Sequence, residues 1–149
     1  MGLKDILFGK EVQISDTKLG VLKARIKKTH PSINYVWASE VLLSEQQNET
    51  VIVLEGNSEG PFKKQLESAY SIVDNLTNIQ EQIIVESKKN KNKIKYNGDW
   101  IKQFYLAAIT PIDVRDNSFE VNFEPINQDD NGYILLTWKN SKISELDIK

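Results

Sequence analysis

Hydrophobic and polar residues alternate along most of the chain, and the period of the alternation changes twice. From residue 10 to about residue 60 the period is close to two residues, which is typical of half-buried strands. From residue 61 to residue 88 the spacing is that of a helix, and beyond residue 104 it returns to two. The pattern therefore predicts strands, then a helical segment, then strands again.

Four strands are predicted before the helical segment, at residues 11–14, 20–28, 34–43 and 50–54. The second alternates most clearly, because Leu22, Ala24 and Ile26 fall on one face and Lys23, Arg25 and Lys27 on the other. Such a pattern indicates an antiparallel strand with one buried face. Loops of a few residues between these strands favour a meander.

Residues 2–8 can form one helical turn with Leu3, Ile6 and Leu7 on one side. Short amphipathic segments at a chain end are more often docking turns or frayed ends than membrane anchors. We therefore expect residues 1–9 to be a short helical lead-in.

An apolar stripe at spacings of three and four residues, from Phe62 to Ile83, predicts the helical segment. Pro61 suits a first helical position, with Asn57 or Ser58 as a nearby cap. The stripe fits one long helix or two helices joined near residues 75–78, where Thr77 can be the N-cap of the second, with Gln80 three residues on. We expect the helix to be bent or interrupted there.

The last third of the chain predicts strands at residues 105–114, 118–124 and 133–139, with a short final strand at 143–148. Before them, Asp99 is expected to cap a short turn that carries Trp100, Ile101 and Phe104. Pro111 falls inside a predicted strand, which indicates an edge position, a bulge or a break.

Neither strand group has a second layer of its own to cover it, so we expect both to share one sheet. The predicted fold is a single α+β domain over residues 1–149. Its antiparallel sheet has about seven strands, arranged as a meander, a central long or jointed helix and a second meander. The helix is expected to pack on one face of the sheet.

Composition changes this picture mainly by exclusion. Hydrophobic residues make up 40% of the chain and charged residues 27%, which is typical of a globular protein. The chain has no Cys and one His, which excludes disulfides, thiolate metal sites and His-rich metal sites. The seven Gly are scattered and form no phosphate-binding loop, so no nucleotide cofactor is expected. The Cys and His counts likewise give no reason to expect a metal.

Net charge and apolar run length bear on compartment and partners. The net charge of −2 gives no overall attraction to nucleic acid or anionic lipid. No apolar stretch approaches the roughly 20 residues of a membrane span, and Ile6–Phe8 is too short for a signal peptide. We therefore expect a cytoplasmic protein without a membrane partner. Its 17 Lys against 2 Arg are typical of an AT-rich bacterial genome.

His30, the one imidazole, is the residue on which any histidine-dependent catalysis would have to rely. It lies in a Thr-His-Pro-Ser turn, and neither Ser32 nor Ser39 has the Gly-x-Ser-x-Gly context of a nucleophile elbow. A surface turn residue is the favoured interpretation.

Carboxylates are the other candidates for chemistry. Glu40, Glu55, Glu120 and Glu124 project from predicted strands, and two inward-facing carboxylates would suit a glycosidase. Glu120 and Glu124 fall on a polar face, which leaves Glu40 as the candidate for an unusual environment. Residues 129–132 (Asp-Asp-Asn-Gly) resemble half a Ca²⁺ loop, but strands flank them, so we expect an acidic turn with Gly132 at positive φ.

Lysines at 88, 89, 91, 93 and 95 could contact phosphates. They lack the interleaved aromatic residues of a single-strand-binding platform, and lysines also complement the dipole at a helix C-terminus. A solvated helix end is favoured, and nucleic acid is not the expected partner.

Several segments in a fixed order carry a resemblance: residues 19–22 (Leu-Gly-Val-Leu), the strand of Trp37, residues 51–56, Gly60-Pro61, Trp100, residues 118–123 and residues 130–134. Over residues 18–148 the chain resembles small bacterial α+β families of unknown function, some linked to immunity-type proteins. One such group has a Gly-His pair where this chain has Gly132-Tyr133. The resemblance implies a binding role and carries over no catalytic, cofactor or metal residue.

The sequence therefore predicts a non-enzymatic protein-binding domain of immunity or adaptor type, with a homodimer as a further possibility. The alternative is a small-ligand-binding protein or a hydrolase that uses carboxylates. A third interpretation is a weak nucleic-acid binder that uses Lys88–Lys95.

Overall fold

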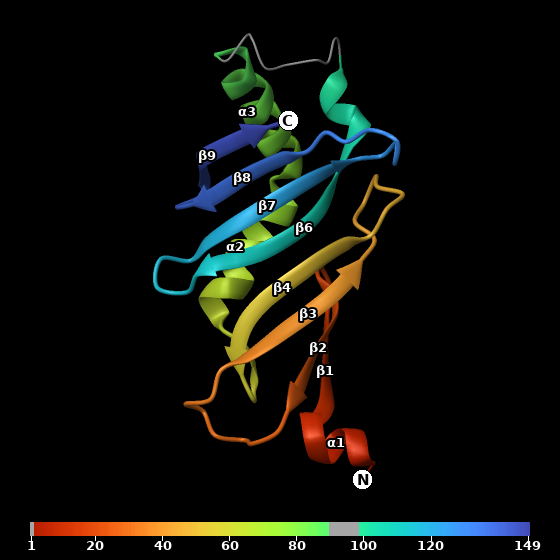
Figure 1. The fold of residues 1–149 in the computed structure, drawn as a ribbon. Helices are drawn as coiled ribbons and strands as arrows, with labels where there is room; N and C mark the ends of the chain where they lie inside the picture. The colour runs from red at the N-terminus through yellow and green to blue at the C-terminus, as the bar shows by residue number, and fades with distance from the viewer. Residues whose placement is uncertain (1, 90–98) are drawn as a thin grey trace.

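A computed structural model describes residues 2–89 and 99–149, in which nine strands form one sheet (Figure 1). The strands before the helices are β1 (Lys10–Asp16), β2 (Gly20–Ile26), β3 (Tyr35–Val41), β4 (Thr50–Asn57) and β5 (Gly60–Pro61). Those after them are β6 (Phe104–Asp113), β7 (Ser118–Pro125), β8 (Ile134–Lys139) and β9 (Lys142–Ile148). The described helices are α1 (Leu3–Phe8), α2 (Lys63–Asp74), α3 (Leu76–Lys88) and the 3₁₀ helix η1 (Trp100–Gln103).

The two meanders meet at a parallel pair in the middle of the sheet. The strand order is β1-β2-β3-β4-β6-β7-β8-β9, with β5 paired to β4 alone. Strands β4 and β6 are parallel, with Val51 opposite Ala108 and Ile52 opposite Ile109, while the other described pairs are antiparallel. A parallel neighbour requires the chain to cross over between the two strands, and helices α2 and α3 lie on that crossover.

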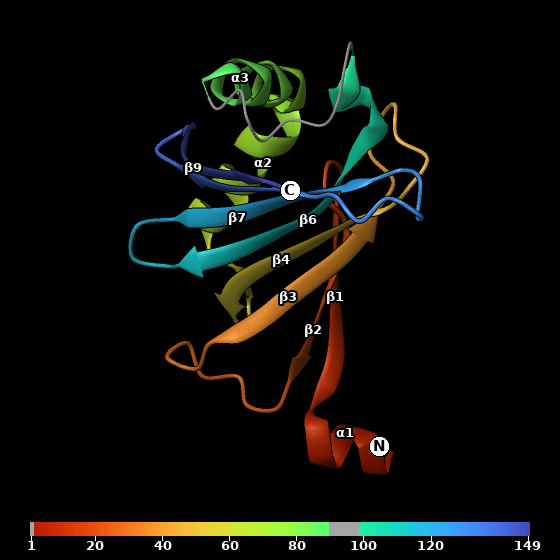
Figure 2. The same ribbon diagram turned by 45° about the horizontal axis from the view of Figure 1, so that its top comes forward.

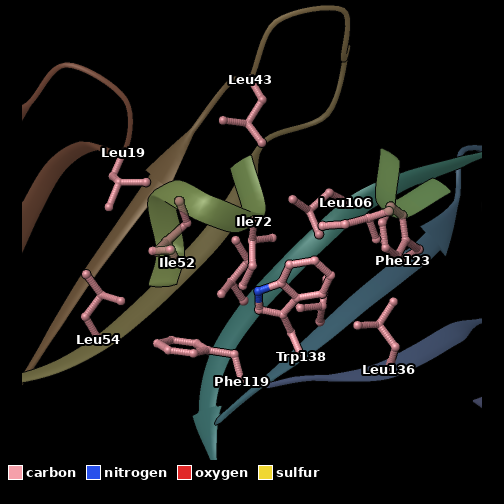
Figure 3. Close-up of a cluster of buried hydrophobic side chains, with 14 of the residues drawn as sticks. Leu19, Leu43, Ile52, Leu54, Ile72, Leu106, Phe119, Phe123, Leu136 and Trp138 are labelled. Carbon is pink, nitrogen blue, oxygen red and sulfur yellow. The ribbon is translucent and has the colours of Figure 1, made fainter. Parts of the chain in front are cut away.

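Helices α2 and α3 cover one face of the sheet, and Figure 2 shows the other face without a helix. We call these the covered face and the open face. In the core, Ile72 of α2 lies among side chains from β4, β6, β7 and β8 (Figure 3). The alternation predicted from the sequence is confirmed here, since Leu22, Ala24 and Ile26 are buried on the covered face.

The helical segment is interrupted at Asn75, as expected from the sequence. The Asn75 side chain donates from Nδ2 to the Ser71 carbonyl at 2.8 Å, and its own N–H bonds the Ile72 carbonyl at 3.3 Å. An Asn side chain that binds the preceding turn competes with the helical backbone pattern. Thr77 is therefore not the cap that its position suggested, because α3 begins one residue earlier, at Leu76.

The expected start of the first helix is also wrong. Pro61 belongs to β5, α2 begins at Lys63 after Phe62, and no side chain caps it. The β4–β5 hairpin is the reason, since a Cβ at Gly56 would lie 2.1 Å from the Gly60 carbonyl oxygen. The chain stays extended through this close approach, and the Phe62 N–H still bonds the Glu55 carbonyl at 2.9 Å.

The sheet has nine strands where the sequence predicted about seven. Strand β5 is two residues long, too short to show a period. Pro111 lies in β6, which β4 and β7 flank, so the edge alternative is wrong. Register shifts at 106/108 and 111/113 confirm the bulge alternative instead.

Asp99 precedes η1 as expected, but its side chain makes no capping hydrogen bond. Its carboxylate instead lies 3.3 Å from the Lys102 Nζ atom. Trp100 and Phe104 pack edge to face, with ring centroids 6.1 Å apart. The short turn is therefore held by its apolar side chains.

We expect Ile72→Ala to lower the free energy of unfolding by about 2–5 kcal/mol, because it leaves a cavity between α2 and the central strands. The matched control is Val85→Ala in α3, at a position that is 57% exposed. Ala is the better helix former, so the control is expected to change stability by less than about 0.5 kcal/mol. Urea unfolding of both variants checks the prediction, and equal losses would contradict the assignment of the covered face.

Candidate interaction surface

A row of side chains crosses the open face from β3 to β9. Each member is the register partner of the next: Glu40, Val51, Ala108, Asn122, Leu135 and Asp147. The middle of the row is uncharged and its two ends are acidic. A second row, Thr110, Glu120, Thr137 and Glu145, runs alongside it.

Exposed carboxylates surround the uncharged centre of these rows. They are Glu40, Glu49, Glu120, Glu124, Glu145 and Asp147. The cations Lys23 and Arg25 lie toward the β1–β2 end, and Lys139 is paired with Asp116 at 3.0 Å. The potential over β4 and β6–β9 is therefore negative, although the whole chain carries only −2.

Two of the open hollows on this face are bordered by these carboxylates. One, of about 530 Å³, has an apolar floor that includes Val21, Ala38 and Val51, with Glu40 and Glu49 at its rim. The other, of about 420 Å³, is bordered by Glu124 and Tyr133, with Leu135 as an apolar part of its wall. Both combine a small apolar surface with carboxylates.

Two tyrosine hydroxyls donate to carboxylates on the open face. The Tyr105 hydroxyl lies 3.2 Å from Glu124 Oε2. Its pKa is raised above the usual value, mainly by burial and also by the negative charge of Glu124. The Tyr133 hydroxyl donates to Asp147 Oδ2 at 3.1 Å, and this hydrogen bond raises the pKa of Tyr133. Both rings therefore stay neutral at physiological pH and hold these carboxylates in place.

His30 is exposed in its turn, and its Nδ1 atom lies 2.6 Å from the Ser32 hydroxyl. The backbone N–H of Ser32 also bonds that nitrogen, at 3.2 Å, so the pair closes the turn itself. Ser39 is buried and donates to the Leu19 carbonyl at 2.6 Å. The structure thus brings His30 and Ser32 together within an exposed turn and places Ser39 apart from them, in a buried bond to the Leu19 carbonyl.

The predicted carboxylates separate into two environments. Glu40, Glu120 and Glu124 are exposed on the open face, so the unusual environment expected for Glu40 is wrong. Glu55 is half-buried, and its backbone N–H bonds the side chain of Gln65 at 3.1 Å. Glu55 Oε2 and the buried Gln65 Nε2 have no hydrogen-bond partner among the described residues.

Residues 129–132 form a turn closed by side chains, as expected. Asn127 Oδ1 accepts from the Asp129 N–H at 3.1 Å, and Asp130 Oδ1 accepts from the Gly132 N–H at 2.8 Å. Gly132 does not have the positive φ that the sequence suggested. The Asx-type bonds close this turn without it, whereas Asn140 and Ser141 do take positive φ in the β8–β9 hairpin.

The lysine run lies largely outside the described residues. Lys88 ends α3, and Lys89 pairs with Glu86 at 2.9 Å. Lys91, Lys93 and Lys95 fall in the part of the chain that the structure does not describe. The nucleic-acid interpretation therefore stays a prediction.

A polar cluster of Asp16, Lys18, Tyr70 and Asp74, which the sequence did not predict, joins the β1–β2 turn to α2. The Tyr70 hydroxyl donates to Asp16, and Lys18 bonds Asp74 while its Nζ atom lies 5.4 Å from the centre of the Tyr70 ring. The Asp16 hydrogen bond and burial raise the pKa of Tyr70 to about 12. Burial would raise the pKa of Asp16, but bonds from Tyr70, Leu19 and Lys18 outweigh it and lower that pKa. Because Asp16 also accepts from two backbone N–H groups, we interpret the cluster as structural.

The sequence alone did not predict the open-face rows, because their members lie on six strands and the strand register that aligns them cannot be read from the sequence. The available signal was the apolar residues on otherwise polar strand faces. Val21, Val36 and Val51 all stand at such positions and are exposed.

Among residues 2–89 and 99–149, no group of three or more His, Cys, Asp or Glu side chains is placed to hold a metal. Nor does any helix in these ranges have the length and apolarity to cross a membrane.

Comparisons with known proteins return nothing: no family model, no curated protein and no solved structure matches this chain significantly.

We expect Tyr70→Phe to lower the free energy of unfolding by about 1 kcal/mol near pH 7, because Asp16 loses a hydrogen bond. The folded pKa of Tyr70 lies above its unfolded value of 10, so this stabilisation is complete below pH 10 and is lost toward pH 12. The folded pKa of Asp16 lies below its unfolded value of 3.8, so its stabilisation is lost as the pH falls below that value. Urea unfolding of both proteins at acid, neutral and alkaline pH measures the difference. If the difference in unfolding free energy between the two proteins did not change with pH, the assigned hydrogen bond between Tyr70 and Asp16 would be contradicted.

Proposed function

We propose that this chain is a non-enzymatic protein-binding domain of immunity or adaptor type, which binds a protein with a basic surface across its open face. The observation that carries the proposal is the ring of exposed carboxylates around an uncharged centre on β4 and β6–β9. The resemblance to immunity-linked families, expected from the sequence, points to the same class of function.

The apolar positions on this face support binding to a folded surface. Val21, Val36 and Val51 are large apolar residues that the fold leaves exposed, and Val36 is 59% exposed. Val21 and Val51 line the larger hollow with Lys23, Glu40 and Glu49, whereas Val36 lines a further hollow with Lys23 and Arg25. An apolar centre with a charged rim is the usual anatomy of a protein interface.

The charges favour a basic partner. Six exposed carboxylates face solvent on one side of the sheet, and complementary charges speed association and select the partner. Such attraction weakens with salt, because the screening length falls to about 8 Å at physiological ionic strength. We therefore expect an association rate that drops as salt rises.

For the hydrolase alternative, Glu40 and Glu49 form a candidate carboxylate pair, since they share the larger hollow. Both side chains are exposed, and the hollow is open to solvent. A binding role needs no enclosed site and therefore fits this geometry better.

We expect Glu120→Lys/Glu145→Lys to reduce capture of the partner at least tenfold in a pull-down from lysate of the source organism, read by quantitative mass spectrometry. These two carboxylates flank Thr137 on neighbouring strands, so the variant reverses the charge along one side of the uncharged centre. The lysate is treated with nuclease so that nucleic acid does not bridge the proteins.

The matched control is Glu67→Lys/Glu81→Lys, which makes the same charge change on exposed residues of α2 and α3. A stoichiometric basic protein retained by the wild type and the control but lost by the open-face variant supports the proposal. Equal retention by both variants would overturn the assigned surface. If the wild type captures no stable partner, or captures only a second copy of this chain, the proposal of a basic partner is overturned.

A further inference from the structure

Helix α1 is held in a fixed position by polar contacts at the end of β1 and β2. Gly9 follows it at φ 86°, and a Cβ there would lie 2.6 Å from the Ile26 backbone, so the chain passes too close for any other residue. Arg25 donates to the Gly9 carbonyl at 2.8 Å and pairs with Asp5 at 3.3 Å. Lys27 Nζ lies 3.4 Å from the Leu7 carbonyl oxygen.

Although α1 is fixed in this way, none of its residues is buried. Its four large apolar side chains, Leu3, Ile6, Leu7 and Phe8, are between 54% and 72% exposed. At 100° per residue, Leu3, Ile6 and Leu7 share one side of the helix, and Asp5 lies nearly opposite them. Because Asp5 faces Arg25 on β2, the apolar side is turned away from the domain.

The surroundings of this apolar side are cationic. Lys4, Lys10, Lys27 and Lys28 are all exposed at this end of the molecule. Of the nearby acids, Asp5 is paired with Arg25, and Glu11 lies opposite Arg25 in the β1–β2 register. The α1 end is therefore positive, in contrast to the acidic open face over β6–β9.

We propose that the α1 end docks on an anionic lipid surface, with its apolar side chains in the headgroup region and the four lysines at the headgroup phosphates. An apolar helix face flanked by lysines is the combination that binds such an interface, and it requires no span. Figures 1 and 2 both show α1 at the extremity of the molecule opposite α3, where a flat surface can reach it. The proposal rests on α1 and its lysines and is independent of the open-face partner.

The proposal departs from the sequence expectation of no membrane partner. Residues 2–8 were expected to be a docking turn or a frayed end, and a turn docked on its own fold would bury Leu3, Ile6 or Leu7. The structure keeps all three exposed while Arg25 and Gly9 fix the helix. The whole-chain charge of −2 also conceals the positive end.

Sedimentation with vesicles tests the proposal. The wild type is expected to bind vesicles of equal parts phosphatidylglycerol and phosphatidylcholine, and to bind pure phosphatidylcholine at least tenfold less. Ile6→Ser/Leu7→Ser and Lys4→Glu/Lys28→Glu are each expected to reduce binding at least tenfold. Neither variant touches a buried side chain, so both should fold.

The matched control is Ile112→Ser/Ile126→Ser, which removes two comparably exposed apolar side chains away from α1 and should bind as the wild type does. A Leu3→Trp variant adds a second measurement, because the fluorescence that it adds to that of the three native Trp should shift to the blue on anionic vesicles. No binding to anionic vesicles at low salt would overturn the proposal. So would equal binding of the α1 variants, or α1-dependent self-association without vesicle binding, which would assign the site to a second copy.

Discussion

The parallel pairing of β4 with β6 is the contact on which the rest of the architecture depends. It joins two antiparallel meanders into one sheet and requires a crossover, which α2 and α3 supply on one face. The central strands therefore bury Ile52, Leu106 and Ile109 beneath the helices, while Val51 and Ala108 of the same strand pair face the other way. One pair of helices covers one face, and the opposite face is left to solvent or to a partner.

The two exposed features of this fold carry opposite charge. Carboxylates gather on the open face around an uncharged row that includes Asn122 and Leu135, and lysines gather around α1. Because the 19 Lys and Arg of the whole chain nearly balance its 21 Asp and Glu, the net charge of −2 reveals neither feature. Surface function here depends on where the charges lie and not on their sum.

Much of the fold follows from the sequence, because a period of two or of 3.6 residues records which face of an element is buried. The alternation around Leu22 was predictable in this way, whereas the joint near Asn75 was predicted from a cap signal at Thr77, because the apolar stripe fits one helix or two. The β5 hairpin was not, since it is two residues long and depends on the approach of Gly56 to Gly60. Nor were the open-face rows or the bond from Tyr70 to Asp16, because both depend on strand register and on contacts between distant segments. Glu40 was singled out by its apolar strand neighbours, yet alternation places it in solvent.

The central claim, that the open face is the binding surface, is tested most directly by thiol labelling, because the chain has no cysteine of its own. Asn122→Cys places one thiol in the middle of the open-face row, and Ser68→Cys places one on α2 at the other side of the sheet. Labelling rates are measured by mass spectrometry for each variant alone and with the captured partner. We predict that the partner slows labelling at position 122 at least tenfold and leaves position 68 unchanged. The reverse pattern would contradict the account.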